Sequence, residues 1–185
     1  MRKEQKAALC AVALFMSVAP SCRDAGSDPR ELESMSPDAV LFSHVTQSDP
    51  FQTYRLFPGV DSVSSGTLNG STAHQPMVRV SMNGRAFGAL VQGSLPQGSA
   101  FPNGSVIFKQ IIMNNETVLY AVISKDSGNP LAAGGWLWGE YRPDGSAAIS
   151  VTRQGTGCIG CHSREQGPQH DFVRTFERQG HGAGR

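Results

Sequence analysis

The chain has 185 residues, of which 39% are hydrophobic, and its 16 Lys and Arg residues nearly balance its 15 Asp and Glu residues. This length and composition suit one domain with a sizeable core. The balanced charge offers no basic patch or arm for phosphate backbones, which excludes nucleic acid from the expected partners.

The N-terminus has the pattern of an export signal. Arg2, Lys3 and Lys6 form a basic start, and residues 7–19 form an apolar segment that is too short to span a bilayer. We therefore interpret residues 1–21 as a signal peptide and expect a periplasmic or otherwise exported protein.

Two interpretations of the cleavage site stay open. Cleavage before Cys22 fits a bacterial lipoprotein signal, in which an acylated thiol anchors the protein to a membrane surface. Ordinary signal cleavage near the same position would release a soluble periplasmic protein.

The rest of the chain divides into three parts. Residues 22–36 are mostly polar and predict a flexible tether. Residues 37–179 are predicted to form the folded domain, and residues 180–185 form a short tail.

A short helix is expected at the start of the domain. Ser36, Pro37 and Asp38 provide a capping side chain, a proline for the first helical position and an acid for the first turn. The apolar face of this helix is formed by Ala39, Val40, Leu41 and Val45. Residues 61–75 are rich in Ser, Gly and Thr and predict a loop.

Strand signals dominate from Met77 onward, and turn residues separate them. The expected strands cover residues 77–83, 105–113, 117–124, 135–141 and 147–152. The second and third are separated by Asn114, Asn115 and Glu116, which suit a hairpin turn. A short helix or irregular turn is expected at 84–92, and a closing helix at 171–179. Short strands at this spacing predict a mainly β (α+β) fold, in which a curved antiparallel sheet and a few short helices enclose a cofactor.

The cofactor is indicated by Cys158-Ile159-Gly160-Cys161-His162, which is the attachment signature of a c-type haem. Each thiol forms a thioether with one haem vinyl group, and the adjacent imidazole of His162 is then placed to bind the iron. One covalent haem c is therefore predicted, held by Cys158 and Cys161, with His162 as the metal ligand.

The cysteine pair has two other interpretations. A redox dithiol would normally open the first helix of a βαβ unit, whereas this pair follows strand-like sequence near the C-terminus. A zinc site would need two further ligands, and the region after the signal contains no second cysteine pair.

The sequence also resembles a known family. Residues 101–109 (FPNGSVIFK) look like the FPDGSVIVK motif of the cytochrome P-460 family, which includes the cytochrome c′-β proteins. Further matches follow in the family's order at residues 79–83 (RVSMN), 120–126 (YAVISKD), 135–138 (GWLW) and 171–173 (DFV). The resemblance covers roughly residues 38–178. It implies a mostly β haem domain, usually a homodimer, with one open distal site.

The resemblance also implies roles for single residues. His162 matches the proximal ligand, and Lys109 matches the lysine that is bonded to the porphyrin in the P-460 members. Arg79 matches an arginine close to the distal face. The carboxylate that accepts protons in the hydroxylamine-oxidising members falls at or beside Ala121, so this chain departs from the pattern there. Glu140 is the nearest acidic alternative in the sequence.

Each of these residue types also has an ordinary structural interpretation. A lysine in an apolar strand more often lies at an edge or points outward, and two tryptophans on one strand face more often form core or dimer interface. The candidates for a sixth iron ligand are His44, His74, His170, His181, Met82 and Met113.

Two classes of function follow. In the first, the protein binds a small ligand such as nitric oxide at an open distal site, or transfers electrons to a redox partner protein. The alternative is an enzyme that oxidises hydroxylamine, in which Lys109, Arg79 and Glu140 serve the reaction. Without a carboxylate the distal pocket would lack a base, which favours the first class.

Overall fold

The computed structural model describes residues 35–67, 73–164 and 168–176. The predicted signal peptide, the candidate lipid anchor at Cys22, almost all of the tether, the tail and His181 lie outside the described residues. Among the described residues, no helix is long and apolar enough to cross a membrane.

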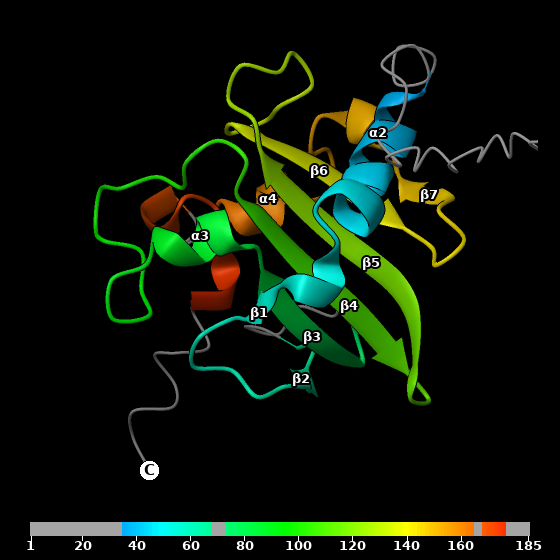
Figure 1. Cartoon of the computed structure of the whole chain (residues 1–185), viewed down its shortest axis with the longest axis horizontal. Coiled ribbons are helices and arrows are strands. Elements are labelled where there is room, and N and C mark those ends of the chain that lie inside the picture. Colours follow the sequence, from blue (N-terminus) through cyan, green and yellow to red (C-terminus); the bar gives the residue numbers. More distant parts are fainter. Residues whose placement is uncertain (1–34, 68–72, 165–167, 177–185) are drawn as a thin grey trace, which may run out of the picture.

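The described residues form one antiparallel sheet of seven strands (Figure 1). Along the sheet the order is β1-β3-β4-β5-β6-β7, and β2 pairs with β3. The strands are β1 Arg55–Leu56, β2 Ser64–Ser65, β3 Met77–Met82, β4 Val106–Met113, β5 Glu116–Lys125, β6 Trp136–Tyr141 and β7 Ala147–Ile149. The predicted mainly β fold is confirmed.

The longest strands, β4 and β5, form the predicted hairpin. Its turn is made by Asn114 and Asn115, which have φ angles of 52° and 65°. Asparagine tolerates this left-handed conformation better than most residues, and two such residues in a row match the twist of the flanking strands. The register shifts by one residue between Ile111 and Ile112, and beyond this irregularity Lys109 lies opposite Ala121.

One face of the sheet is covered by the N-terminal helices. Helix α2 Pro37–Ser43 begins as predicted, since the Ser36 Oγ accepts a hydrogen bond from the Ala39 amide at 3.2 Å. It continues into the single π turn η1 His44–Ser48 and then the 3₁₀ turn η2 Phe51–Thr53. Figure 1 shows α2 and η1 lying across β4–β6. Leu41 and Val45 bury their side chains there, against aromatic residues of the strands.

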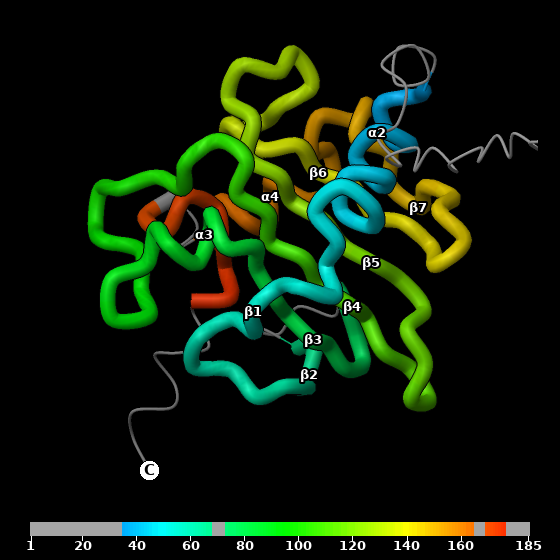
Figure 2. The backbone as a smooth tube through the Cα atoms, in the orientation of Figure 1, coloured from blue at the N-terminus to red at the C-terminus, as the bar shows by residue number. Residues whose placement is uncertain are grey.

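The opposite face is covered by α3 Gly84–Gly88, α4 Ile159–His162 and the C-terminal segment, with the 3₁₀ turn η4 Pro168–His170 beside them. The 3₁₀ turn η3 Val151–Arg153 packs against α2 on the first face. Figure 2 follows this path, in which the orange and red parts of the chain run next to the green α3. Trp136 and Trp138 are buried in this second core, as their shared strand face predicts.

Three predicted segments differ in the structure. The loop at 61–75 contains the short strand β2, and the returning strand expected at 147–152 ends at Ile149, where η3 begins. No α-helix starts at 171, because Asp171 and Phe172 adopt left-handed φ angles of 50° and 67°. Tertiary contacts of these two residues override the local helix preference.

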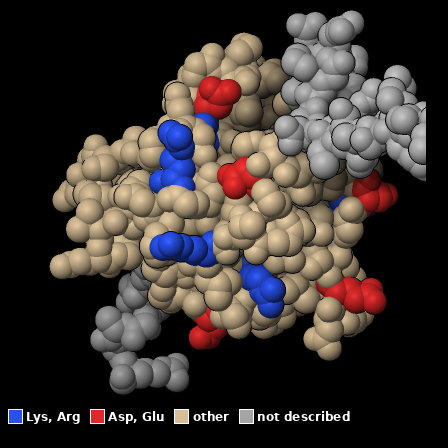
Figure 3. All heavy atoms as spheres, in the orientation of Figure 1, with Lys and Arg blue, Asp and Glu red and all other residues tan. Residues whose placement is uncertain are grey.

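The face that carries α2 has few charged side chains. Figure 3 shows basic and acidic groups lying singly among uncharged residues, with neither sign gathered into a patch on this face.

Candidate functional site

The predicted haem-attachment motif forms one turn of helix beside the second core. Cys158 caps α4, and the amides of Cys161 and His162 both donate to its carbonyl at 3.1 Å. Residues three and four positions apart share one side of a helix, so both thiols and the imidazole point the same way.

The approach to this turn depends on Gly155. Its φ is 72°, and a Cβ at this position would lie 2.8 Å from the indole ring of Trp138. Glycine alone combines this backbone with this close contact. The buried tryptophan of β6 therefore fixes where the motif begins.

The imidazole of His162 is held in one orientation. Its Nδ1 lies 2.7 Å from the carbonyl oxygen of Phe172, and a carbonyl only accepts, so Nδ1 carries the hydrogen and donates it. The edge of the ring meets the Trp138 ring, with centroids 5.0 Å apart at 73°. Nε2 is thereby left as the nitrogen with a free electron pair, which is the form that binds a metal.

The surroundings keep the ligand groups uncharged in the absence of a metal. Burial, and then the positive charge of Lys109, lower the pKa of His162 to about 3. Burial, and then the negative charge of Glu140, raise the pKa of the Cys158 thiol to about 11. A neutral imidazole is the state that coordinates iron.

A cavity opens in front of the motif. Its volume of about 480 Å³ lies in the range of roughly 300–1,000 Å³ that is typical of cofactor and ligand sites. Both thiols and His162 line it, together with the apolar side chains of Ile111, Val118, Leu119 and Ile149. Apolar walls for a macrocycle, two thiols and one oriented imidazole are what a c-type haem requires, so these residues fit the group.

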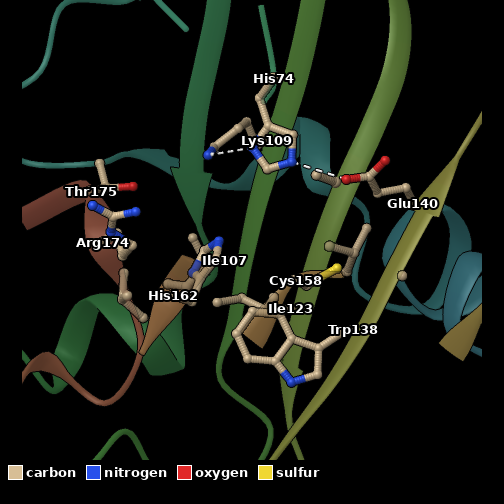
Figure 4. A pocket seen from close by; sticks show the side chains of 14 residues that line it. His74, Ile107, Lys109, Ile123, Trp138, Glu140, Cys158, His162, Arg174 and Thr175 are labelled. Carbon is tan, nitrogen blue, oxygen red and sulfur yellow. Dashed lines mark hydrogen bonds and ion pairs between the residues drawn. The ribbon is translucent and has the colours of Figure 1, made fainter. Parts of the chain in front are cut away.

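A polar wall faces the motif across the cavity (Figure 4). The Nζ of Lys109 lies 3.1 Å from His74 Nδ1, and His74 Nε2 lies 2.9 Å from Glu140 Oε1. The side chains of His74 and Glu140 are only 19% and 14% exposed. Three titratable groups thus form a continuous hydrogen-bonded chain on the surface of the site.

Sheet register explains how this chain arises. Ala121 pairs with Lys109 of β4 on one side and with Glu140 of β6 on the other, so all three residues share the face of the motif. Ala121 lines a smaller adjoining pocket and has no carboxylate. Glu140, the acidic alternative in the sequence, lines both this pocket and the cavity, because β6 places it level with Ala121.

The structure does not bring Arg79 to this site. It pairs with Gln110 on the other face of the sheet, is exposed, and donates from Nε to the Ser62 carbonyl at 3.2 Å. Lys109 does not lie on a sheet edge, since β4 pairs with strands on both sides.

Of the weaker ligand candidates that the structure describes, His74 alone lines the cavity. His44 lies at a separate groove beside α2, and the ring of His170 packs on Phe176 with centroids 4.7 Å apart. Met82 is buried in the core, and Met113 is 48% exposed at the end of β4.

Arg174 is a site residue that the sequence analysis missed. It is buried, lines the cavity, and its Nη1 lies 2.7 Å from Cys161 Sγ. Its position directly after the matched residues 171–173 could have pointed to it in the sequence. Only the fold shows that this segment passes beside the motif.

A mainly β domain with a Cys-x-x-Cys-His turn beside an apolar cavity has the features of a c-type haem protein. The family model for Cytochrome P460 matches residues 64–175, which is more than half of the chain. The chain therefore belongs to the cytochrome P460 family, as its resemblance predicts. No curated protein matches it.

Proposed function

We propose that this protein is an exported mono-haem cytochrome that oxidises a small nitrogen compound of the hydroxylamine type. The observation that carries the proposal is the chain of hydrogen bonds from Lys109 through His74 to Glu140, on the wall that faces His162. The carboxylate of Glu140 can accept protons in place of the carboxylate that the resemblance puts at or beside Ala121.

The direction of the chain follows from donor chemistry. A lysine ammonium only donates, so Nδ1 of His74 accepts, and its Nε2 carries the hydrogen and donates to Glu140. The carboxylate is the acceptor at the end of the chain. Its partner His74 is partly exposed, which gives protons a path from the cavity to solvent.

The reaction releases protons that need such an acceptor. Removal of two electrons from NH₂OH yields HNO and two protons, so each turnover places two protons in the cavity. A haem held by Cys158, Cys161 and His162 would supply a one-electron acceptor, so the two electrons would pass one after the other to a redox partner protein. Glu140 would act as general base for the protons, with His74 positioning its carboxylate.

A second function is favoured by a separate observation. A smaller pocket, which shares Cys158 and His162 with the cavity, is also walled by Ile107, Ile123 and Val173. Such a surface admits small neutral molecules, so nitric oxide binding without turnover is the competing proposal.

Glu140→Gln separates the two proposals. The amide keeps an oxygen for the His74 hydrogen bond but is not a base. Steady-state oxidation of hydroxylamine, with an artificial electron acceptor, should fall by about a hundredfold or more. Nitric oxide affinity of the ferrous protein should stay unchanged, since binding releases no proton.

The control is Glu116→Gln, an exposed residue at the start of β5, which should retain full turnover. Tight nitric oxide binding with no hydroxylamine turnover in the unmodified protein would replace the first proposal by the second. Retained turnover in Glu140→Gln would show that another group accepts the protons.

Lys109 has a further proposed role. Its amine lines the same cavity as the motif, which supports the porphyrin bond that the resemblance implies. Proteolysis followed by mass spectrometry should then yield a haem joined both to the cysteine-motif peptide and to a Lys109 peptide. A haem joined to the motif peptide alone would rule out the bond.

Export and assembly are also proposals. The signal pattern at residues 1–21 supports a periplasmic location, and Cys22 offers a lipid anchor. Cell fractionation, with Cys22→Ser as the comparison, distinguishes a lipoprotein from a soluble periplasmic form. Sedimentation of the purified holoprotein tests the homodimer implied by the resemblance.

A further inference from the structure

The segment that orients His162 is held by a buried ion pair. Lys125 Nζ lies 2.7 Å from Asp171 Oδ1, and both side chains are less than a tenth exposed. Asp171 stands next to Phe172, whose carbonyl accepts the hydrogen bond of His162. The ion pair is therefore one residue away from the acceptor that fixes the imidazole.

The backbone between them needs this support. Asp171 and Phe172 have φ angles of 50° and 67°, a region that residues other than glycine seldom occupy. Such a conformation persists only when surrounding contacts hold it. It turns the Phe172 carbonyl toward α4, where His162 lies.

All three oxygen atoms of Asp171 accept hydrogen bonds from buried residues. Its Oδ2 accepts from the Phe101 amide at 2.9 Å, and its carbonyl accepts from Trp136 Nε1 at 2.9 Å. Lys125 is fixed in turn, since its Nζ lies 4.9 Å from the centre of the Trp136 ring. A side chain at Gly135 would meet this Nζ at 3.0 Å, so the ammonium has little room to move.

We propose that Lys125 and Asp171 are positioning residues for the proximal ligand. They hold the Phe172 carbonyl in place, so that it accepts from His162 Nδ1 and fixes the plane of the ring. Such a hydrogen bond makes the opposite nitrogen a stronger donor to a metal. The ion pair thereby helps to set the reduction potential of the haem. This inference depends on His162 as iron ligand and not on oxidation of hydroxylamine.

The test is the midpoint potential of the holoprotein in Asp171→Asn and Lys125→Met, measured by spectroelectrochemistry. A less basic imidazole stabilises ferric iron less, so both variants should shift the potential to more positive values. We expect about a tenfold change in the reduced-to-oxidised ratio, which is about 59 mV for a one-electron couple.

The pair of variants separates positioning from simple charge. Loss of the carboxylate alone would raise the potential through space, whereas loss of the ammonium would lower it. Shifts of the same sign in both variants support the proposal, and shifts of opposite sign, or none, overturn it. The double variant removes both charges and avoids an unpaired buried group. It should still shift positive, although the two charge effects cancel.

A second measurement reads the ligand directly. The iron–histidine stretching frequency of the ferrous protein should fall in each variant, because the bond weakens with the basicity of the imidazole. The matched control is Asp38→Asn, since Asp38 also accepts a backbone amide, that of Val151 at 2.8 Å, but on the other face of the sheet. An equal shift of the potential in this control would show general loosening and overturn the proposal.

Discussion

The two faces of the central sheet are built from the same strands and have opposite characters. Lys109 faces the cavity, while its neighbour Phe108 is fully buried on the other side. Glu140 lines the cavity and its neighbour Tyr141 is fully buried. Successive residues of a strand point to opposite faces, so one short sequence serves both a polar site and an aromatic core.

The face that carries α2, here called the aromatic face, is closely packed. The Phe51 and Phe108 rings stack with centroids 4.3 Å apart at 7°, and Tyr54 meets Phe108 edge-on. The other face also has a core, which includes Trp136 and Trp138, but a cavity lined by titratable groups lies beside it. Packing therefore contributes to the free energy of folding on both faces, whereas cofactor chemistry belongs to the cavity face alone.

The strongest way to sharpen this comparison is to remove cofactor attachment alone. Cys158→Ser combined with Cys161→Ser, in a Lys109→Ala background, should abolish covalent haem completely, since neither a thiol at the motif nor the Lys109 amine then remains. Mass spectrometry of the denatured protein should show the polypeptide mass without haem. Ser163→Ala in the adjacent position should retain the haem. Haem that survives denaturation in the triple variant would contradict the assignment of the motif.

The opposite test removes packing and leaves the site residues in place. Phe108→Ala should lower the free energy of unfolding by about 3–5 kcal/mol, because it deletes a buried aromatic ring from a filled core. Denaturant unfolding of the holoprotein measures this loss. Haem attachment in the folded fraction should persist.

The control for that variant lies on the same strand. Met113 is 48% exposed at the end of β4, so Met113→Ala should change the free energy of unfolding by less than about 1 kcal/mol. Equal losses in both variants would mean that the packing of Phe108 contributes little to stability.

Much of this arrangement was predictable from local patterns. The spacing of Cys158, Cys161 and His162 predicts the haem turn, and the pair Asn114–Asn115 predicts the hairpin between the longest strands. Period-two alternation also predicts that Trp136 and Trp138 share a core. Each of these patterns depends on residues that are close in the sequence.

The polar wall was not predictable in the same way. Glu140 reaches the site because two successive pairings bring it level with Lys109, and pairing register is a property of the whole sheet. His74 comes from a loop without periodicity. Asp171 does not adopt the expected helical conformation, because its carboxylate is bound to Lys125, 46 residues earlier in the chain.

The smallest expected effect concerns Tyr141 on the aromatic face. Its hydroxyl donates to Asp38 Oδ1 at 3.3 Å, and burial, together with that carboxylate, raises the pKa of the phenol above its usual value of 10. The folded protein therefore favours the neutral phenol. This contribution to stability is fully present below pH 10 and is lost as the pH rises further, because the unfolded phenol ionises first.

Tyr141→Phe should accordingly flatten the fall of unfolding free energy above pH 10, measured by denaturant titration at several pH values. The control Ser150→Ala also removes a hydrogen bond to Asp38, one of 2.6 Å, but removes no group that ionises in this range. It should lower stability equally at every pH and leave the slope unchanged. If Tyr141→Phe keeps the alkaline slope of the unmodified protein, the aromatic face does not hold the phenol neutral. Tyr141 would then titrate as readily as a group on the cavity face, although it is buried on the opposite face from its neighbour Glu140.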